Sequence, residues 1–411
     1  MGHRPQLERL RAGIDILLKS NRFYQQRLHP VSTWDDFARL PLTTKAEITA
    51  DQQAAPPFGT NLTFPVERYT RLHQTSGTSG SSPLRWLDTP DSWDWWIRIW
   101  AEHIYRSAGV RADDRVFFAF SFGPFIGFWS AFGGAERLGA LVVPGGAMST
   151  EQRLRTMLEL RATVLCSTPT YAIRLAEAAT AAGIDLASSG IRITLHAGEP
   201  GASVPATRGL IERSFGAHCF DHTGMTELGP TGVSCAARDG VHLIESEFVF
   251  EVRDDAGTVH HLPDAGTISG ELVATNLGRW GSPLIRYRTG DRVEVTRAPC
   301  SCGSPFPKML GGIRGRVDDM FTLRGVNLYP SQVEDLVRRH AAIGEFCIEV
   351  RRVRGMEEVT ILCECQEGSD DVIDRLAADL RLALGARIPC RRVAAGSLPR
   401  SELKARRLVR A

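Results

Sequence analysis

A loop dense in hydroxyl groups and glycines is the first segment of this sequence that could do chemistry. Between Thr75 and Ser82 the chain reads TSGTSGSS, which places hydroxyls beside backbone N–H groups that no bulky side chain shields. A flexible loop of this kind can wrap phosphate oxygens. The Walker pattern GxxxxGK[ST] is absent from the sequence. Taken alone, the loop also fits a solvated linker.

Three further polar segments each lie at the end of an expected strand. They are Ala197-Gly198-Glu199, the segment DHTGMTE from Asp221 to Glu227, and the segment YRTGD from Tyr287 to Asp291. Taken singly, Asp291 fits a turn and Glu227 fits a helix cap. In open parallel sheets, ligands bind beyond the carboxyl ends of the strands. The ordered recurrence of these segments after the Ser/Thr/Gly loop therefore predicts one shared ligand site.

A set of cysteines and a histidine is a candidate metal site. Cys300 and Cys302 lie in a loop rich in Gly and Pro, and Cys235 and His242 flank a turn. Three thiolates and an imidazole are the ligand types of closed, structural zinc sites. A CxC pair alone is weak support, since both thiols can simply be free.

Alternating strands and helices must position these loops. The apolar runs predict strands at Arg115–Phe120, Ala140–Pro144, Thr163–Ser167 and Ile191–Ala197, with helices such as Glu151–Leu160 and Tyr171–Ala182 between them. Repeated strand–helix units predict a parallel sheet covered by helices. Short β runs between Val241 and Val295 predict a β-rich subdomain. From Asp318 the order starts again, with a helix at Val333–His340, strands at Phe346–Arg352 and Glu358–Gln366 and a helix at Asp371–Leu384, which predicts a small α+β domain.

Composition and charge limit the classes of function. The 411 residues are 43% hydrophobic and 23% charged, which is typical of a globular protein and argues against disorder, collagen and coiled coil. Lys and Arg number 49 and Asp and Glu number 47, so a nucleic-acid partner is not expected. The apolar run from Val116 to Gly134 contains Pro124 and several glycines, and it predicts a strand, a turn and a packed helix rather than a membrane span. The nine cysteines and the charged start of the chain favour a cytoplasmic location.

Taken together, the motifs resemble those of the adenylate-forming acyl- and aryl-CoA synthetases, and within them the phenylacetate-CoA ligase branch. The resemblance covers nearly the whole chain and rests on QTSGTSGSSP, HAGEP, DHTGMTE, YRTGD, GRVDDMFTLRGVNLYPSQVED and LPRSELKARRL. It implies an α/β fold with a large N-terminal domain (residues 1–317, including the β-rich subdomain) that binds ATP and the acid, and a small mobile α+β C-terminal domain (residues 318–411). It also implies that ATP converts a carboxylate into an acyl adenylate, whose acyl group a thiol then accepts.

The resemblance assigns roles to individual residues. Lys404 would bridge the carboxylate and the α-phosphate, although this sequence reads ELK where many relatives carry Gly before the lysine. Thr226 and Glu227 would serve the α-phosphate and Mg²⁺. The other nucleotide contacts would come from Thr75, Ser76, Gly77, Thr78 and Ser79 at the pyrophosphate, from Ala197, Gly198, Glu199, Asp221, His222 and Thr223 at the adenine, and from Asp291 and Arg316 at the ribose, with Asp318 as the hinge. A carboxylate such as Asp291 suits a ribose because its two oxygens can accept from a vicinal diol.

The acyl pocket is expected along the apolar run. Its candidate residues are Phe122, Gly123, Pro124, Ile126, Gly127 and Phe128, together with His222. Most of these residues also fit an ordinary core. Flat aromatic walls and small glycines suit a planar aryl acid better than a long acyl chain. His222 could bond a hydroxyl or amine on the ring.

The resulting hypothesis is an aryl-CoA ligase that uses ATP, Mg²⁺ and coenzyme A, with a homodimer expected by analogy with the family. The resemblance also supports structural Zn²⁺ at Cys235, His242, Cys300 and Cys302, because some chains of this branch carry a Cys/His cluster in this region. One alternative is transfer of the acyl group to the phosphopantetheine thiol of a carrier protein. Another is a nucleotide-binding module without chemistry, against which the presence of Glu227, Asp291 and Lys404 argues.

Overall fold

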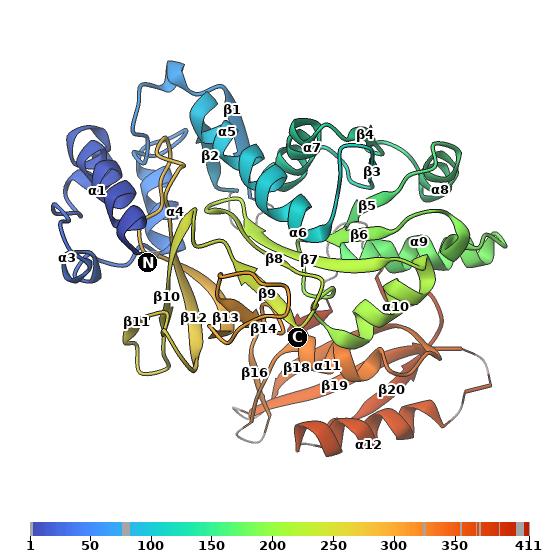
Figure 1. Ribbon diagram of the computed structural model, residues 1–411. Helices are drawn as coiled ribbons and strands as arrows, with labels where there is room; N and C mark the ends of the chain where they lie inside the picture. The colour runs from blue at the N-terminus through green and yellow to red at the C-terminus, as the bar shows by residue number, and fades with distance from the viewer. Residues whose placement is uncertain are drawn as a thin grey trace.

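One long sheet joins the expected parallel strands to the β-rich segment. The computed structural model describes residues 3–75, 83–323, 326–353, 356–366, 368–369, 371–385, 387–399 and 407–410 (Figure 1). Its largest sheet has 13 strands in the order β11-β10-β12-β13-β14-β9-β8-β7-β6-β5-β3-β4, and β15 pairs with β13. The strands are β3 (Arg115–Phe118), β4 (Leu141–Pro144), β5 (Val164–Ser167), β6 (Ile193–His196), β7 (His218–Met225), β8 (Gly229–Ser234), β9 (Gly240–Leu243), β10 (Phe248–Arg253), β11 (Val259–His261), β12 (Thr267–Asn276), β13 (Tyr287–Thr296), β14 (Lys308–Leu310) and β15 (Gly315–Arg316). The β-rich segment is therefore continuous with the parallel strands, not a separate sheet.

Strand β7 is where the two halves of this sheet meet. Its first half runs parallel to β6, with Asp221 beside His196, and its second half runs antiparallel to β8, with His222 beside Val233. The pairing of β7 changes from parallel to antiparallel between Asp221 and His222, two residues that were expected to bind nucleotide. Ligands of open sheets bind beyond the carboxyl ends of the parallel strands, and Asp221 is the last residue of β7 that pairs with the parallel strand β6.

Helices cover both faces of the parallel strands. They are α5 (Pro90–Ile99), α6 (Arg106–Ala108), α7 (Ile126–Leu138), α8 (Thr150–Glu159), α9 (Pro169–Ala181) and α10 (Pro205–Phe215), with short 3-10 turns at Val66–Arg68 and Leu186–Ser188. Val116 and Phe118 pack on one face with α5 and α7, whereas Phe117 packs on the other with α8, α9 and α10, as alternation along a strand requires. A π-helix at Trp100–Tyr105 continues α5. Within the described residues, no helix is long and apolar enough to cross a membrane.

The N-terminal helices pack against the antiparallel half of the sheet. They are α1 (His3–Ser20), α2 (Arg22–Gln25), α3 (Trp34–Ala38) and α4 (Lys45–Ala54), and the β1–β2 hairpin (Arg71–Gln74 and Arg85–Asp88) follows them. Thr44 is the N-cap of α4 and forms a capping box with Glu47. The Thr43 amide donates to the carbonyl of Arg286 at 2.9 Å, next to β13. This bond holds the start of α4 against the sheet.

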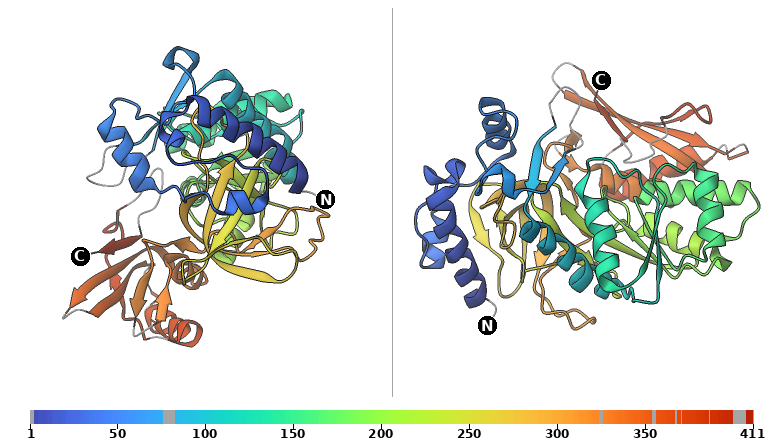
Figure 2. Two further views of the ribbon diagram at one scale, coloured as in Figure 1. Left: turned by 90° about the vertical axis from the view of Figure 1, so that its left-hand side faces the viewer. Right: turned by 90° about the horizontal axis from the view of Figure 1, so that it is seen from above.

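The residues from Phe321 onward form a smaller body with its own core, which we call the small lobe; the residues up to Arg316 form the large lobe. Its elements are β16 (Phe321–Leu323), β17 (Val326–Leu328), α11 (Pro330–Val337), β18 (Ile343–Val353), β19 (Met356–Cys365), α12 (Val372–Leu384), β20 (Cys390–Val393) and β21 (Leu408–Arg410). Four of the strands form one sheet in the order β20-β19-β18-β21. Figure 2 shows this lobe at one end of the molecule. Helix α11 starts three residues before the predicted Val333 because Pro330 suits a first helical position.

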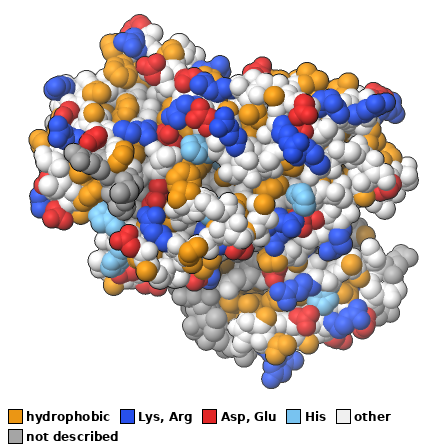
Figure 3. All heavy atoms as spheres, in the orientation of Figure 1, with side chains coloured by type: hydrophobic (Ala, Val, Ile, Leu, Met, Phe, Trp, Pro, Cys, Tyr) orange, Lys and Arg blue, Asp and Glu red, His pale blue; other side chains and the backbone are white. Residues whose placement is uncertain are grey.

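On the face drawn in Figure 3, basic and acidic side chains are interspersed rather than gathered by sign. This distribution agrees with the nearly balanced counts of basic and acidic residues in the sequence.

Candidate active site

A cleft of about 1800 Å³ brings most of the predicted site residues together. Its walls come from loops of the large lobe after β5, β6 and β7, from β13 and β15, and from α11 of the small lobe. The predicted residues that line it are Thr75, Ile126, Gly127, Phe128, Ala197, Gly198, Glu199, Asp221, His222, Thr223, Thr226, Glu227, Asp291, Arg316 and Asp318. Segments separated by more than two hundred residues in the sequence thus line one cleft.

The Ser/Thr/Gly loop begins at the end of β1. The Thr75 amide donates to the carbonyl of Leu84 at 3.0 Å, and the Thr75 hydroxyl accepts from the Leu84 amide at 3.0 Å. These bonds close the hairpin and leave Thr75 at the edge of the cleft. Ser76, Gly77, Thr78 and Ser79 lie outside the described residues, as does Lys404.

The ends of β6 and β7 form the wall predicted for adenine. Gly198 has a φ of +96°, which favours glycine, and the Glu199 carboxylate accepts from the amide of Thr170 at 2.9 Å. The Ser203 hydroxyl donates to the Asp221 carboxylate. Burial raises the pKa of Asp221 to about 7, against the lowering effect of the Ser203 bond. The Asp221 carboxyl group is thus held in place at a site where burial favours its neutral form.

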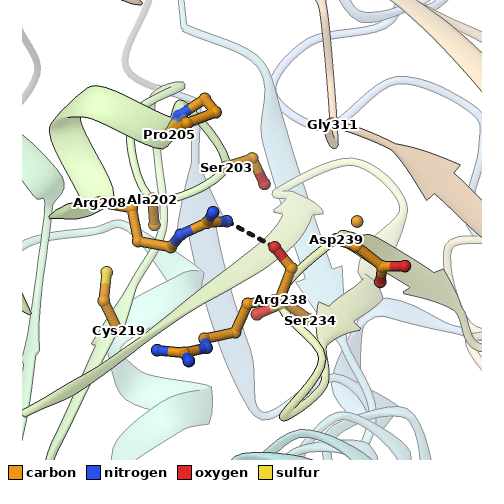
Figure 4. A pocket seen from close by; sticks show the side chains of 10 residues that line it. Ala202, Ser203, Pro205, Arg208, Cys219, Ser234, Arg238, Asp239 and Gly311 are labelled. Carbon is orange, nitrogen blue, oxygen red and sulfur yellow. Dashed lines mark hydrogen bonds between the residues drawn. The ribbon is translucent and has the colours of Figure 1, made fainter. Parts of the chain in front are cut away.

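A smaller cavity of about 130 Å³ adjoins this wall at Ser203. Figure 4 shows the Arg208 guanidinium directed at the backbone carbonyl of Arg238, which it contacts at 2.5 Å. Arg238 in turn pairs with Glu212. The basic groups of this cavity are therefore engaged within the protein.

A buried ion pair holds the loop of Thr226 and Glu227. Arg279 is fully buried and donates to both oxygens of Asp88 at 2.7 and 2.8 Å. Another of its nitrogens donates to the carbonyls of Thr226 and Glu227 at 2.7 and 3.0 Å. The ring centres of Trp86 and Trp96 lie 5.4 and 5.1 Å from the guanidinium carbon. Arg279 thus fixes the backbone beneath two predicted catalytic residues, and no sequence motif indicated it.

Lys45 is a second residue that the sequence reasoning missed. Its ammonium group lies 3.4 Å from the Glu227 carboxylate, and it lines the cleft from the first position of α4. A cation at a helix N-terminus opposes the helix dipole. That conflict is the sequence signal that could have marked Lys45 as functional.

The ribose motif on β13 is held by Arg316. The Arg316 guanidinium donates to the Asp291 carboxylate at 3.2 Å and to the carbonyl of Thr289 at 3.0 Å. Gly290 has a φ of +74°, which favours glycine, and an added Cβ would lie 2.7 Å from an Arg316 nitrogen. Arg316 also pairs with the exposed Asp318 at 3.2 Å. Burial raises the pKa of Asp291 to about 6, and the charge of Arg316 opposes that rise.

Aromatic side chains line the end of the cleft near α5 and α7. Phe120 and Phe128 stack with centroids 3.5 Å apart, and the Trp100 ring lies 4.4 Å from His222. The His222 Nδ1 lies 2.8 Å from the carbonyl of Gly232, and burial lowers the pKa of His222 to about 4. The ring is therefore neutral near pH 7, with its proton on Nδ1 and with Nε2 as an acceptor.

Part of the predicted acyl pocket lies elsewhere. Phe122, Gly123 and Pro124 are not among the residues that line the cleft. The Phe122 ring instead packs on Trp129 and Phe132, at 4.9 and 5.6 Å. The turn before α7 directs these residues away from the cleft, whose aromatic lining comes from Trp96, Trp100, Phe120, Phe125 and Phe128.

The four predicted metal ligands lie together. The donor atoms of Cys235, His242, Cys300 and Cys302 are all within 4.8 Å of one another. The Cys235 and Cys300 sulfurs are 3.6 Å apart, and the Cys302 sulfur is 3.4 Å from the His242 Nε2. Tetrahedral zinc bonds would separate such ligands by about 3.5–3.8 Å. The His242 Nδ1 lies 3.0 Å from the carbonyl of Phe306, which leaves Nε2 directed at the thiols. The donor set therefore fits zinc.

Comparison with known proteins identifies the family. Residues 325–410 match the family described as AMP-binding enzyme C-terminal domain. The chain is 32% identical to the phenylacetate-coenzyme A ligase of Pseudomonas putida, over 97% of this chain and 92% of that protein. A structure of 2-hydroxyisobutyryl-CoA ligase (HCL) in the postadenylation state with 2-HIB-AMP has a TM-score of 0.92 at 28% identity, covering 99% of this chain and 89% of that chain. HCL with 2-HIB-AMP and CoA in the thioesterification state has a TM-score of 0.73 at 30% identity and the same coverage. The chain therefore belongs to the phenylacetate-CoA ligase branch of the adenylate-forming enzymes, and it is an AMP-forming acid–thiol ligase.

Proposed function

We propose that the protein activates an aromatic carboxylic acid with ATP and transfers the acyl group to coenzyme A. The observation that carries this proposal is the single cleft that has aromatic side chains at one end and the predicted nucleotide loops along its walls. A carboxylate oxygen of the acid would attack the α-phosphate, and pyrophosphate would leave. The thiolate of CoA would then attack the acyl carbon, and AMP would leave.

In the first step two anions meet, so the protein must supply positive charge and oriented donors. We assign Lys404 to the carboxylate and the α-phosphate, and Thr75, Ser76, Gly77, Thr78 and Ser79 to the pyrophosphate. Lys45 adds a second cation to the cleft beside Glu227. The carboxylate of Glu227 is a hard oxygen donor of the type that Mg²⁺ prefers, with Thr226 next to it. When bound there, Mg²⁺ would offset charge on the leaving pyrophosphate.

The nucleoside is assigned to the remaining walls. Asp291, assisted by Arg316, would accept hydrogen bonds from both ribose hydroxyls. Adenine would lie between the segment Ala197-Gly198-Glu199 and the segment from Asp221 to Thr223. The raised pKa of Asp291 makes ribose binding depend on pH near 6.

For the acid, we propose a ring that carries a hydrogen-bond donor such as a hydroxyl or amine. A neutral His222 with Nε2 as acceptor is the polar group that would receive it, at an otherwise aromatic end of the cleft. The name of the Pseudomonas putida relative, phenylacetate-coenzyme A ligase, also favours an aromatic acid. HCL, which has an aliphatic hydroxy acid in its name, makes a small hydroxy acid the second candidate.

We further propose that residues 1–317 and 318–411 are the two domains, with Asp318 as the hinge between them. The higher TM-score against HCL in the postadenylation state supports an adenylate-forming arrangement for the present structure. Zinc at Cys235, His242, Cys300 and Cys302 would be structural, because the adenylation chemistry needs no open metal position. The homodimer, the cytoplasmic location and the carrier-protein alternative stay predictions from the sequence.

A panel of acids in a pyrophosphate-release assay tests this function. We expect hydroxybenzoic and aminobenzoic acids to be activated better than benzoic and phenylacetic acids, with CoA required for the thioester product. His222→Leu should remove this preference and leave activity on benzoic acid. Preference for 2-hydroxyisobutyrate over every aromatic acid would contradict the aryl assignment, and transfer only to a carrier protein would contradict the role of CoA.

A further inference from the structure

The two lobes meet through a small set of polar contacts at the start of α10. The amide of Ala206 donates to the Asp335 carboxylate of α11 at 3.0 Å. The hydroxyl of Thr207 donates to the Glu334 carboxylate at 3.2 Å, and Thr207 is fully buried. Two consecutive residues of the large lobe therefore bond two consecutive carboxylates of the small lobe.

Arg407 lies at the centre of this interface. Its guanidinium donates to Glu334 at 3.1 Å and to Glu345 at 3.0 Å, both in the small lobe. A third nitrogen donates to the Thr170 hydroxyl of the large lobe at 3.4 Å. The side chain is only 9% exposed, and its guanidinium carbon lies 5.0 Å from the centre of the Phe346 ring. One buried arginine thus bridges both lobes.

The large-lobe side of this bridge is connected to the predicted adenine wall. The Thr170 amide donates to the Glu199 carboxylate at 2.9 Å. Burial lowers the pKa of Arg407, but the charges of Glu334, Glu345 and Glu199 raise it overall. The electrostatic field of Glu199 therefore stabilises the positive charge of Arg407 across the interface.

Arg407 also stands three residues after Lys404 in the sequence. Its carbonyl accepts from the Ile348 amide at 2.6 Å, just before β21 pairs with β18. The side chain of Arg407 therefore contacts both lobes immediately before the chain enters the small-lobe sheet.

Two structures of HCL match the present structure to different degrees. Coverage of both chains is the same for the postadenylation and thioesterification structures of that enzyme, yet the TM-scores are 0.92 and 0.73. The present structure is therefore more similar to the postadenylation structure than to the thioesterification structure. The contacts of Arg407 and Thr207 therefore belong to the arrangement that resembles the postadenylation state.

We propose that Arg407 is a positioning residue that latches the small lobe in the adenylate-forming arrangement, through Glu334 and Glu345 on one side and Thr170 on the other. The proposal rests on the two-step function proposed above. The latch must release before the small lobe can turn, so it favours the first half-reaction without taking part in the second. A merely structural arginine inside the small lobe would affect both halves alike.

The two half-reactions can be measured separately. ATP–pyrophosphate exchange reports adenylation, and a synthetic aryl adenylate mixed with CoA reports thioester formation. Arg407→Gln should lower kcat/KM for exchange about 10- to 100-fold, since it removes charge-assisted hydrogen bonds. Thioester formation should change less than about threefold or become faster, because the latch is not needed there. Arg407→Lys keeps the charge and should recover part of the loss.

Variants in the large lobe test the same interface without changing a residue of the small lobe. Thr207→Val and Thr170→Val each remove one bond across the interface and leave the arginine and both glutamates in place. Each variant should lower kcat/KM for ATP–pyrophosphate exchange about 2- to 10-fold, again without slowing thioester formation. Thr180→Val is the matched control, because the exposed Thr180 hydroxyl donates to the Ala176 carbonyl within α9.

Amide hydrogen exchange gives a readout that does not need the ligase reaction. The Ala206 amide bonds Asp335 across the interface, so Arg407→Gln should speed exchange in residues 204–208 and leave residues 172–179 unchanged. Unaltered protection at 204–208 would overturn the proposal, as would equal losses in both half-reactions or full adenylation activity in the threonine variants. If the wild-type protein adenylates no acid, the proposed function fails. The amide hydrogen exchange of residues 204–208 still decides in that case whether Arg407 joins the lobes.

Discussion

Replacing Asp291 with asparagine tests the assignment of the ribose site. Asp291 is 6% exposed, and Arg316 donates to one of its carboxylate oxygens at 3.2 Å. The asparagine side chain has nearly the same size, so packing is preserved. It carries no charge, however, and one of its two acceptors becomes a donor. Of the two ribose hydroxyls that would donate to Asp291, only one then finds an acceptor on the asparagine side chain.

The size of the effect follows from these contacts. A hydrogen bond to a charged group contributes about 1.5–3 kcal/mol, and the variant loses one such bond and weakens the other. Because about 1.4 kcal/mol corresponds to a factor of ten, a loss of about 2–3 kcal/mol predicts a KM for ATP about 30- to 150-fold higher. The exposed Asp371→Asn, on the small lobe, serves as the control and should leave this KM unchanged.

The pH dependence of the KM for ATP is an independent test of the ribose assignment. Burial raises the pKa of Asp291 to about 6, above the ordinary 3.8; Glu227 and Asp318 add to the rise, and Arg316 opposes it. In the free enzyme this carboxyl group therefore takes up a proton as the pH falls through about 6. ATP needs the carboxylate form, so the wild-type KM for ATP should rise below that pH by about tenfold per unit. Asp291→Asn should not show this rise.

Pyrophosphate exchange at varied ATP concentration, from pH 5 to 8, measures both effects, and calorimetry with AMP measures binding without turnover. A KM for ATP in Asp291→Asn within about twofold of the wild-type value would refute the ribose assignment, since the loss of one charge-assisted bond exceeds that factor. A pH profile that persists unchanged in the variant would show that another group titrates.

Three further predictions concern other parts of the site. Lys404→Ala should lower pyrophosphate exchange by at least about a hundredfold while a synthetic adenylate still reacts with CoA; equal losses in both assays would contradict its role in the first step. Arg279→Met should lower the free energy of unfolding by about 3–5 kcal/mol in denaturant titrations, because the buried Asp88 carboxylate then has only the imidazole of His73 beside it. A loss below about 1 kcal/mol would contradict this reasoning. Metal analysis should find one zinc per chain in the wild-type protein and none in Cys300→Ser. Removal of zinc by a chelator should lower the free energy of unfolding by about 2.7 kcal/mol, relative to protein with free zinc at a hundred times its Kd. A metal-free wild-type protein grown with zinc would contradict the zinc site.

The strands and helices that depend on local sequence patterns were predictable. The strands β3 to β6 and helices α8 and α9 match their predicted ranges within two residues, because apolar runs and helical periodicity are local signals. The joining of the β-rich segment to the parallel strands was not predicted. It depends on β7 pairing in opposite senses with β6 and β8, and such pairing is set by tertiary contacts rather than by the residues of β7.

The site shows the same division. Its loops were predictable because each carries a motif, and the structure brings the described ones to one cleft. Arg279 was not predictable, since its partner Asp88 lies 191 residues away and a lone arginine carries no pattern. The aromatic lining was predicted only in part. Phe122 and Phe128 belong to one apolar run, and the turn before α7 decides which of them faces the cleft.

The chemistry of the lobe interface suits a two-step enzyme better than an apolar interface would. Its described contacts include hydrogen bonds from Ala206 to Asp335, from Thr207 to Glu334, from Arg407 to Thr170 and from Ser331 to the carbonyl of Arg314. When such groups separate, water replaces each partner, so a typical bond contributes only about 0.5–1.5 kcal/mol net. An apolar interface would lose about 25 cal/mol for each Å² it exposed, with no compensating bonds to water. A few directional bonds can therefore define one arrangement of the lobes and still permit another, which is what alternation between adenylation and thioester formation requires.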